Sequence, residues 1–242
     1  MSRIELLGLP LDAVDTEAAI ARIDELMARP GLDPVVTLNP EIVVRARAQP
    51  ELARAVRRAS LVTPDGVGIL WAARRLCGLE LGERVTGVDL VTQLLERHRD
   101  RIRVFFLGGR PGVAERAAEA ARRRFGTRVA GAHHGYFEDP SEVVPLVAAA
   151  RPDLLLVGLG ERQEVFVEAH REELGARVAI GVGGTLDVLA GAARRAPELT
   201  RRLGIEWAWR VGTDPRRWRR APRLLAFVLA VEGARLRGSA PC

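Results

Sequence analysis

Four apolar segments dominate the middle of the chain, and they read VFFLGG (104–109), VAGAHHGYF (129–137), DLLLVGLG (153–160) and VAIGVGG (178–184). Each has the length of a strand, and sequence with helical spacing follows the first three, at 112–125, 141–150 and 163–174. Strands that are continuously apolar are typical of a parallel sheet covered on both faces. The pattern therefore predicts an α/β fold of Rossmann-like type, mostly parallel, with helices on both faces of the sheet.

Glycine stands at the end of several of these segments. In open parallel sheets, ligands bind beyond the carboxyl ends of the strands, and glycine there lets the backbone approach a ligand closely. We therefore expect Gly108, Gly109 and Gly184 to contact a substrate. The glycine fingerprint of dinucleotide-binding proteins is absent after 104–107, so an NAD site is not expected.

Two earlier segments place polar side chains at the same kind of junction between strand and helix. LVTPDGVGIL (61–70) puts Asp65 after an apolar strand, and VVTLNPEIV (35–43) puts Thr37 and Asn39 before a helix expected over 41–60. Asp-Gly is often only a turn, and a polar residue before a helix is often only its N-cap, so a structural role stays open for all three. Arg84, in a polar loop, is a candidate anion contact or a solvated surface residue.

The composition is that of a globular protein, with 48% hydrophobic and 28% charged residues in 242. The chain contains no lysine, which excludes a Walker A phosphate loop and Schiff-base catalysis by lysine. Adjacent residues of a strand point to opposite faces, so His133 and His134 are poorly placed to share an ion, and no Asp-x-Asp occurs. We expect neither a metal site nor a cofactor.

Positive charge is concentrated at the C-terminal end. Residues 194–242 hold 12 arginines and four acidic residues, a net charge of +8, against −2 for residues 1–193. Tryptophans at 207, 209 and 218 lie among these arginines, a mixture that suits an anionic membrane surface. We therefore expect two parts, a catalytic core over 1–193 and a helical membrane-docking appendage over 194–242.

The location expected from the sequence is cytoplasmic. The start MSRIELLGLP lacks a long apolar region, and the apolar run 224–231 is far shorter than the roughly 20 residues of a spanning helix.

An ordered set of motifs resembles the WecG/TagA/CpsF glycosyltransferases. The motifs are TLNPEIV (37–43), ASLVTPDGVGI (59–69), ERVTGVDL (83–90), FFLGG (105–109), HHGYF (133–137), Arg-Gln-Glu (162–164), GVGGTLDVLAG (181–191), RRAP (194–197) and GIEWAWR (204–210). The resemblance implies a metal-independent, inverting transfer of an N-acetylmannosamine-type sugar from a UDP donor. The implied acceptor is a polyprenyl-diphosphate-linked N-acetylglucosamine at the inner face of the cell membrane.

The resemblance also implies roles for residues. Asp65 matches the general base, while Thr37, Asn39 and Gln163 match residues that line the site. Asp187 lies in the matching GVGGTLDVLAG motif, where the family often has Phe in place of Leu186. The family also commonly has Gly-x-Pro-Lys-Gln-Glu where this chain reads Gly-Glu-Arg-Gln-Glu at 160–164, and these departures leave the donor sugar open.

The acceptor's diphosphate suits bidentate arginines, for which we choose Arg210, Arg217 and Arg220. A site open to a partner's appendage would also be compatible with a homo-oligomer. The alternative to an enzyme is a non-enzymatic nucleotide- or nucleic-acid-binding module with a basic tail. Because only one end of the chain is basic, a nucleic-acid partner is not expected.

Overall fold

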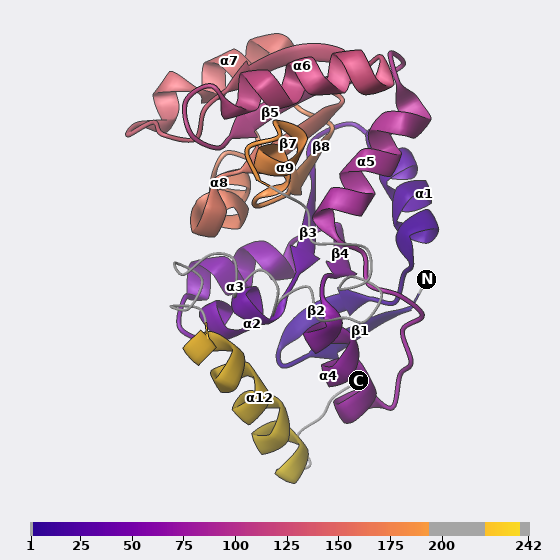
Figure 1. Ribbon diagram of the computed structural model, residues 1–242. Coiled ribbons are helices and arrows are strands. Elements are labelled where there is room, and N and C mark those ends of the chain that lie inside the picture. The colour runs from indigo at the N-terminus through magenta and orange to yellow at the C-terminus, as the bar shows by residue number, and fades with distance from the viewer. Residues whose placement is uncertain (1, 194–220, 238–242) are drawn as a thin grey trace.

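The structure is a computed structural model that describes residues 2–193 and 221–237. Its centre is a six-stranded sheet in which every neighbouring pair of strands is parallel (Figure 1). The strands are, in spatial order, β4 (Leu61–Pro64), β3 (Asp33–Leu38), β8 (Val178–Gly181), β7 (Leu154–Gly158), β5 (Arg103–Gly108) and β6 (Arg128–His133). The predicted α/β fold with a parallel sheet is thus confirmed.

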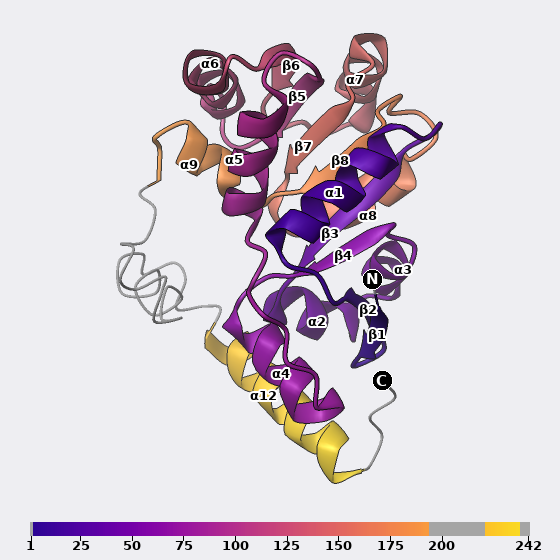
Figure 2. The same ribbon diagram turned by 90° about the vertical axis from the view of Figure 1, so that its right-hand side faces the viewer.

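Both faces of the sheet are buried, which explains the continuous apolar strands. In β5, Val104 and Phe106 join one hydrophobic cluster, while Phe105 and Leu107 join another on the opposite face. The first cluster is closed by α1 (Thr16–Met27), α5 (Gly87–His98), α6 (Val113–Phe125) and α9 (Thr185–Leu189). The second is closed by α7 (Val144–Ala150) and α8 (Gln163–Ala169), and Figure 2 shows the helices on the two sides.

The order in which the chain adds parallel strands across the sheet reverses near its middle. From β3 it runs through α2 (Pro40–Ala46) and α3 (Pro50–Arg57) to β4 at one edge. From β5 it runs through α6, on the opposite face, to β6 at the other edge. Such a reversal opens a crevice beyond the carboxyl ends of the strands, which is where ligands bind in open α/β sheets.

Some predicted boundaries are wrong. The single helix expected over 41–60 is two helices, because Pro50 begins α3 and holds the preceding Gln49 in an extended conformation. The strand expected over 129–137 ends at His133, so the next four residues form a loop. The helix expected over 141–150 is a short 3₁₀ turn, η1 (Pro140–Glu142), followed by α7, and the one expected over 163–174 ends at Ala169.

The N-terminal residues form a small antiparallel hairpin with β1 (Arg3–Leu6) and β2 (Leu9–Asp12). Its attachment to β4 depends on Asp12, which is fully buried. The Asp12 carboxylate accepts hydrogen bonds from Arg3 at 2.8 Å and from the backbone N–H of Val62 at 2.7 Å. A buried carboxylate with these partners fixes the hairpin beside the edge of the main sheet.

Within the region 194–242, which we expected to form an appendage, the structure describes one helix, α12 (Ala221–Leu236). It packs on α2 and on α4 (Val67–Cys77), burying Phe227 and Val231 in the same cluster as both helices. The Trp71 ring of α4 meets Phe227 edge-on, with ring centroids 6.4 Å apart. No helix within the described ranges is long and apolar enough to cross a membrane.

Candidate active site

Asp65 and Asn39 are neighbours at the carboxyl end of the sheet. Thr37 pairs with Thr63 in the parallel register of β3 and β4. Asn39 and Asp65, each two positions further along its strand, therefore leave the sheet side by side. The backbone N–H of Asp65 donates to Leu38 O at 2.8 Å, which holds the acid against the end of β3. The Asp65 side chain is half-buried, and Gly66, with φ of 91°, turns the chain into α4.

Arg84 is brought to the same corner by the backbone. Val85 N–H donates to Pro64 O at 2.8 Å, so the loop before α5 is attached to the end of β4 directly before Asp65. Arg84 is half-buried in that loop. Asp65 and Arg84, which were proposed as separate candidates from the sequence, therefore lie on the same side of the crevice.

Thr37 and Asn39 both have structural partners. The Asn39 Oδ1 accepts from Ile42 N–H at 3.0 Å, so this residue is the N-cap of α2, the alternative that its sequence position left open. The Thr37 hydroxyl, only 5% exposed, donates to Gly181 O at 3.1 Å. That bond joins the end of β3 to the end of β8 underneath the crevice.

Gln163 is also tied to the end of β8. Its Oε1 accepts from Gly183 N–H at 3.1 Å, and its Nε2 donates to Glu164 Oε1 at 2.7 Å. A Cβ at position 181 would lie 2.7 Å from that Nε2, so a larger residue there would displace the amide. These contacts fix which way the amide faces, because only its oxygen can accept from Gly183.

Glu164 is a buried acid at the base of this arrangement. It is 5% exposed, and its Oε2 has no hydrogen-bond partner among the described residues. Burial raises the pKa of Glu164 above the ordinary 4.5, while the hydrogen bond from Gln163 and the charge of Arg45 oppose that rise. The carboxyl group therefore favours its neutral form more than an exposed glutamate does.

A pocket of about 570 Å³ opens beyond the ends of β6, β5, β7 and β8. Of the predicted substrate-binding residues, Gly109 and Asp187 line it. Gly158 and Gly160, two of the glycines at the end of the predicted strand 153–160, line it as well. The lining residues that were not predicted from the sequence are Gly135, Tyr136, Phe137 and Glu138 after β6, Leu159 and Arg162 after β7, and Arg110 after β5. Asp65, Thr37, Asn39 and Gln163 are not among the lining residues, so the candidate site has two parts.

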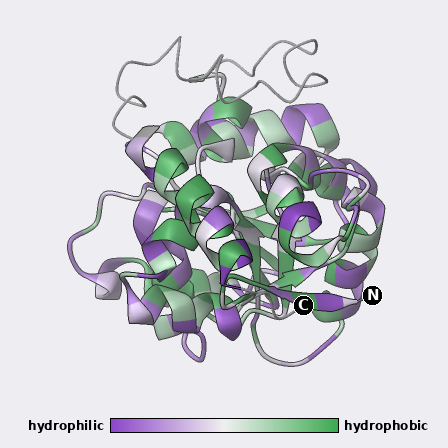
Figure 3. Cartoon of the chain, turned by 90° about the horizontal axis from the view of Figure 1, so that it is seen from below, coloured by the Kyte–Doolittle hydropathy of each residue, from purple (hydrophilic) through white to green (hydrophobic). Residues whose placement is uncertain are grey.

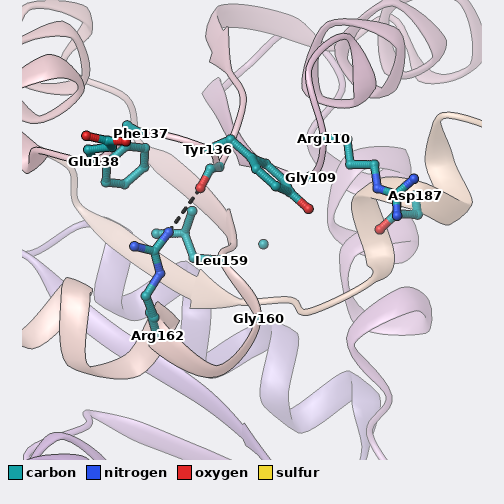
Figure 4. A pocket seen from close by; sticks show the side chains of 11 residues that line it. Gly109, Arg110, Tyr136, Phe137, Glu138, Leu159, Gly160, Arg162 and Asp187 are labelled. Carbon is teal, nitrogen blue, oxygen red and sulfur yellow. Dashed lines mark hydrogen bonds between the residues drawn. The ribbon is translucent and has the colours of Figure 1, made fainter. Parts of the chain in front are cut away.

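Side chains from three loops face one another across this pocket (Figure 4). Tyr136, 66% exposed, extends from the loop after β6 toward Arg110 and Asp187. On the other side, Arg162 donates to Gly135 O at 3.1 Å, and its guanidinium lies 5.6 Å from the centre of the Phe137 ring. The pocket thus offers an exposed aromatic ring and two cationic side chains, which suit a base and a phosphate.

The glycines have distinct places. Gly108, with φ of 138°, is buried where β5 and β7 nearly touch, and the N–H of Gly109 donates to Gly158 O at 3.2 Å. Gly184 is exposed directly before α9, whose first turn carries Asp187. Gly108 therefore shapes the crevice from below, while Gly109 and Gly184 lie at its surface.

His133 and His134 make local contacts. The ring of His133 hydrogen-bonds His134 O at 2.8 Å, and the His134 Nδ1 accepts from Tyr136 N–H at 3.3 Å. Across residues 2–193 and 221–237, no three His, Cys, Asp or Glu side chains gather closely enough to hold a metal ion. Arg210, Arg217 and Arg220 lie outside the described residues.

The family model for "Glycosyl transferase WecG/TagA/CpsF family" matches residues 4–241. The chain belongs to this family. It is 38% identical over 200 residues to a protein of Bacillus spizizenii strain W23, covering 81% of this chain and 77% of that protein. It is 33% identical over 228 residues to a protein of Staphylococcus aureus strain MRSA252, covering 92% and 88%. Both are named N-acetylglucosaminyldiphosphoundecaprenol N-acetyl-beta-D-mannosaminyltransferase.

This WecG/TagA/CpsF protein is therefore a glycosyltransferase, and the non-enzymatic alternative is not supported. The sequence did contain a signal for the residues that were missed. Arg110 directly follows the FFLGG motif, Tyr136 lies within HHGYF, and Arg162 begins Arg-Gln-Glu. Extending the strand to residue 137 concealed Tyr136, because residues inside a strand are not expected to line the crevice.

The raised pKa of Glu164 predicts a pH-dependent cost to folding. In the unfolded chain this carboxyl ionises near 4.5, but in the folded protein it ionises at higher pH. The free energy of unfolding therefore falls as the pH rises from about 4.5 through the folded pKa. Glu164→Gln keeps an oxygen for Gln163 and removes this loss, so it should gain stability relative to wild type as the pH rises.

Urea unfolding between pH 4.5 and 8 measures this difference. The exposed residue Glu172 provides a matched control, since Glu172→Gln removes a carboxyl without emptying a buried position. A difference between wild type and Glu164→Gln that stays constant over this pH range would contradict the assignment.

Proposed function

We propose that this glycosyltransferase moves an N-acetylmannosamine-type sugar from UDP to a polyprenyl-diphosphate-linked N-acetylglucosamine, with inversion and without a metal ion. The observation that carries the proposal is the pairing of an acid at the end of β4 with an arginine-lined pocket at the ends of β5 to β8. The names of the two relatives supply the sugar and the acceptor. The cell-wall or surface-polysaccharide setting follows from that acceptor.

The two parts of the site are spaced for a long donor. Adjacent strands lie about 4.8 Å apart, so the three steps from β4 to β7 span roughly 14 Å and the five steps from β4 to β6 roughly 24 Å. Tyr136 extends back from the β6 loop toward Arg110 and Asp187, so a nucleotide diphosphate sugar need not span the full distance between the edge strands. We place its base on Tyr136, its diphosphate near Arg110 and Arg162, and its sugar toward β3 and β4.

The proposed reaction is a single displacement. Asp65 takes the proton from the acceptor hydroxyl as the hydroxyl oxygen forms its bond to the anomeric carbon of the donor sugar. The bond from that carbon to the diphosphate oxygen breaks on the opposite face, and UDP leaves with the electron pair. Arg110, Arg162 and the backbone N–H groups of the glycine-rich turns offset the charge that develops on the diphosphate.

Metal independence has a chemical reason in this scheme. A divalent ion at a diphosphate would offset its negative charge. In the pocket where we place the diphosphate, Arg110 and Arg162 can supply that positive charge. Arginine is permanently charged and binds phosphate oxygens in pairs. We therefore assign the role of a metal ion to arginine side chains.

The proposed cellular location is the inner face of the cell membrane. Four large apolar side chains of α12 remain exposed and share one side of the helix, namely Leu225, Val228, Leu229 and Leu236. Figure 3 looks at the molecule from this end, where hydrophobic segments of the helices are visible. Trp71 of α4, 37% exposed, lies beside this helix. Arg210, Arg217 and Arg220 remain our proposed contacts to the acceptor's diphosphate.

Asp65→Asn should lower turnover by roughly 10²- to 10⁴-fold, the usual contribution of a general base. Because Asp65 does not line the arginine-rich pocket, the affinity for UDP should stay within about twofold of wild type, a change under about 0.5 kcal/mol. UDP release and calorimetric UDP binding measure the two quantities. Glu80→Gln, an exposed carboxyl paired with Arg74, is the matched control. Wild-type turnover in Asp65→Asn would remove this residue from the base role.

Membrane docking predicts a second result. Leu225→Ser with Leu229→Ser removes two side chains that are 62% and 63% exposed, so folding should be little affected. Burial of a leucine contributes about 1.5–3 kcal/mol, so binding to anionic vesicles should fall at least about tenfold. Leu146→Ser, on α7 at the far end of the molecule, is the control at 51% exposure. Equal co-sedimentation of both variants would argue against docking through α12.

A further inference from the structure

Four charged side chains meet where α12 begins. Arg223 of α12 pairs with Glu41 of α2 and, through Nη1, with Glu161 Oε1 at 2.5 Å. Glu161 lies in the short 3₁₀ turn η2 (Gly160–Arg162) that follows β7. Arg45 of α2 holds the same residue, since its Nη2 donates to Glu161 O at 2.5 Å and its Nε lies 3.5 Å from Glu161 Oε2. We call these four residues the α12 fastening.

The α12 fastening differs from an isolated surface ion pair. Exposed pairs contribute little, because two long side chains must be ordered in water. Here Arg45 is only 9% exposed, and it contacts both the backbone oxygen and the carboxylate of Glu161. The Glu161 carboxylate is therefore held in place for Arg223. The hydrogen bond with Glu161, and then that with Glu41, raises the pKa of Arg223 above its ordinary value.

The turn that carries Glu161 is also a wall of the arginine-lined pocket. Gly160 and Arg162, on either side of Glu161, both line it. Arg162 supports the opposite wall by donating to Gly135 O and covering the Phe137 ring. A shift of Glu161 would therefore move a pocket residue on each side of it.

We propose that Arg223 is a positioning residue: by binding Glu161 it couples the seating of the C-terminal helix to the shape of the donor pocket. The identity of the pocket's ligand rests on the proposed function, whereas the fastening itself does not. Arg220, one of the residues chosen for the acceptor's diphosphate, directly precedes Ala221 in the chain. The fastening therefore also holds the first turn of α12 beside the residues that follow β3 and β7.

The test compares Arg223→Gln, Glu161→Gln and the double variant with wild type. Arg235→Gln is the matched control, because it removes the same charge from the same helix but from a residue that pairs within α12, with Glu232 at 3.9 Å. Hydrogen exchange of the backbone amides over 158–164 reports on the turn. Calorimetry with UDP and the KM for the donor report on the pocket, and circular dichroism verifies folding.

Each single substitution should speed amide exchange over 158–164 and weaken UDP binding by about fivefold. A fivefold change in affinity corresponds to the upper end of what one partly exposed ion pair contributes. The donor KM should rise by the same factor with kcat within about twofold. The double variant should lose less than the sum of the two single effects, because both substitutions remove the contact between Arg223 and Glu161.

Two results would overturn the proposal: unchanged exchange over 158–164 in Arg223→Gln, or an equal increase in Arg235→Gln. Failure of wild type to bind UDP would contradict the proposed function instead, and the exchange data would still decide the fastening.

Discussion

The backbones of β5 and β7 come so close at their carboxyl ends that position 108 admits only glycine. A Cβ there would lie 2.4 Å from Gly158 O, and one at Gly158 would lie 2.9 Å from Gly183 O of the neighbouring β8 turn. The Thr37 hydroxyl adds the next link, to Gly181 O. Because the strands are parallel, their carboxyl ends lie together along one edge of the sheet. The candidate site residues within the described ranges lie at these strand ends or in loops that are hydrogen-bonded to them.

The order of the strand ends explains why the candidate site has two parts. The chain leaves β3 and β5 on opposite faces, so the loops after β4 and β6 lie at opposite ends of the same crevice. The acid, Asp65, stands at the β4 end, and the exposed ring of Tyr136 stands at the β6 end. A donor bound along these strand ends would present its phosphates to Arg110 and Arg162 and its sugar toward Asp65. In the proposed reaction, this geometry separates the group that accepts a proton from the groups that stabilise a leaving diphosphate.

The sequence predicted the sheet well because burial on both faces leaves a clear mark, the continuous apolar segments. It also predicted that Asp65 and Asn39 follow strands, because a turn residue after an apolar run is a local signal. It could not show that the Gln163 amide is fixed by Gly183 and Glu164, since those contacts depend on how α8 packs against β8. The role of Glu161 was equally hidden, because its partners, Arg45 and Arg223, are far away along the chain.

The most direct test of the account is the release of UDP from UDP-N-acetylmannosamine in the presence of a chelator and a short-chain polyprenyl-diphosphate N-acetylglucosamine. The account predicts one UDP released for each sugar transferred, release that depends on the acceptor, and a product of inverted anomeric configuration. Transfer that stops when the chelator is added, or a retained configuration, would contradict the proposed mechanism. No UDP release from folded protein with this donor and acceptor would contradict the central claim.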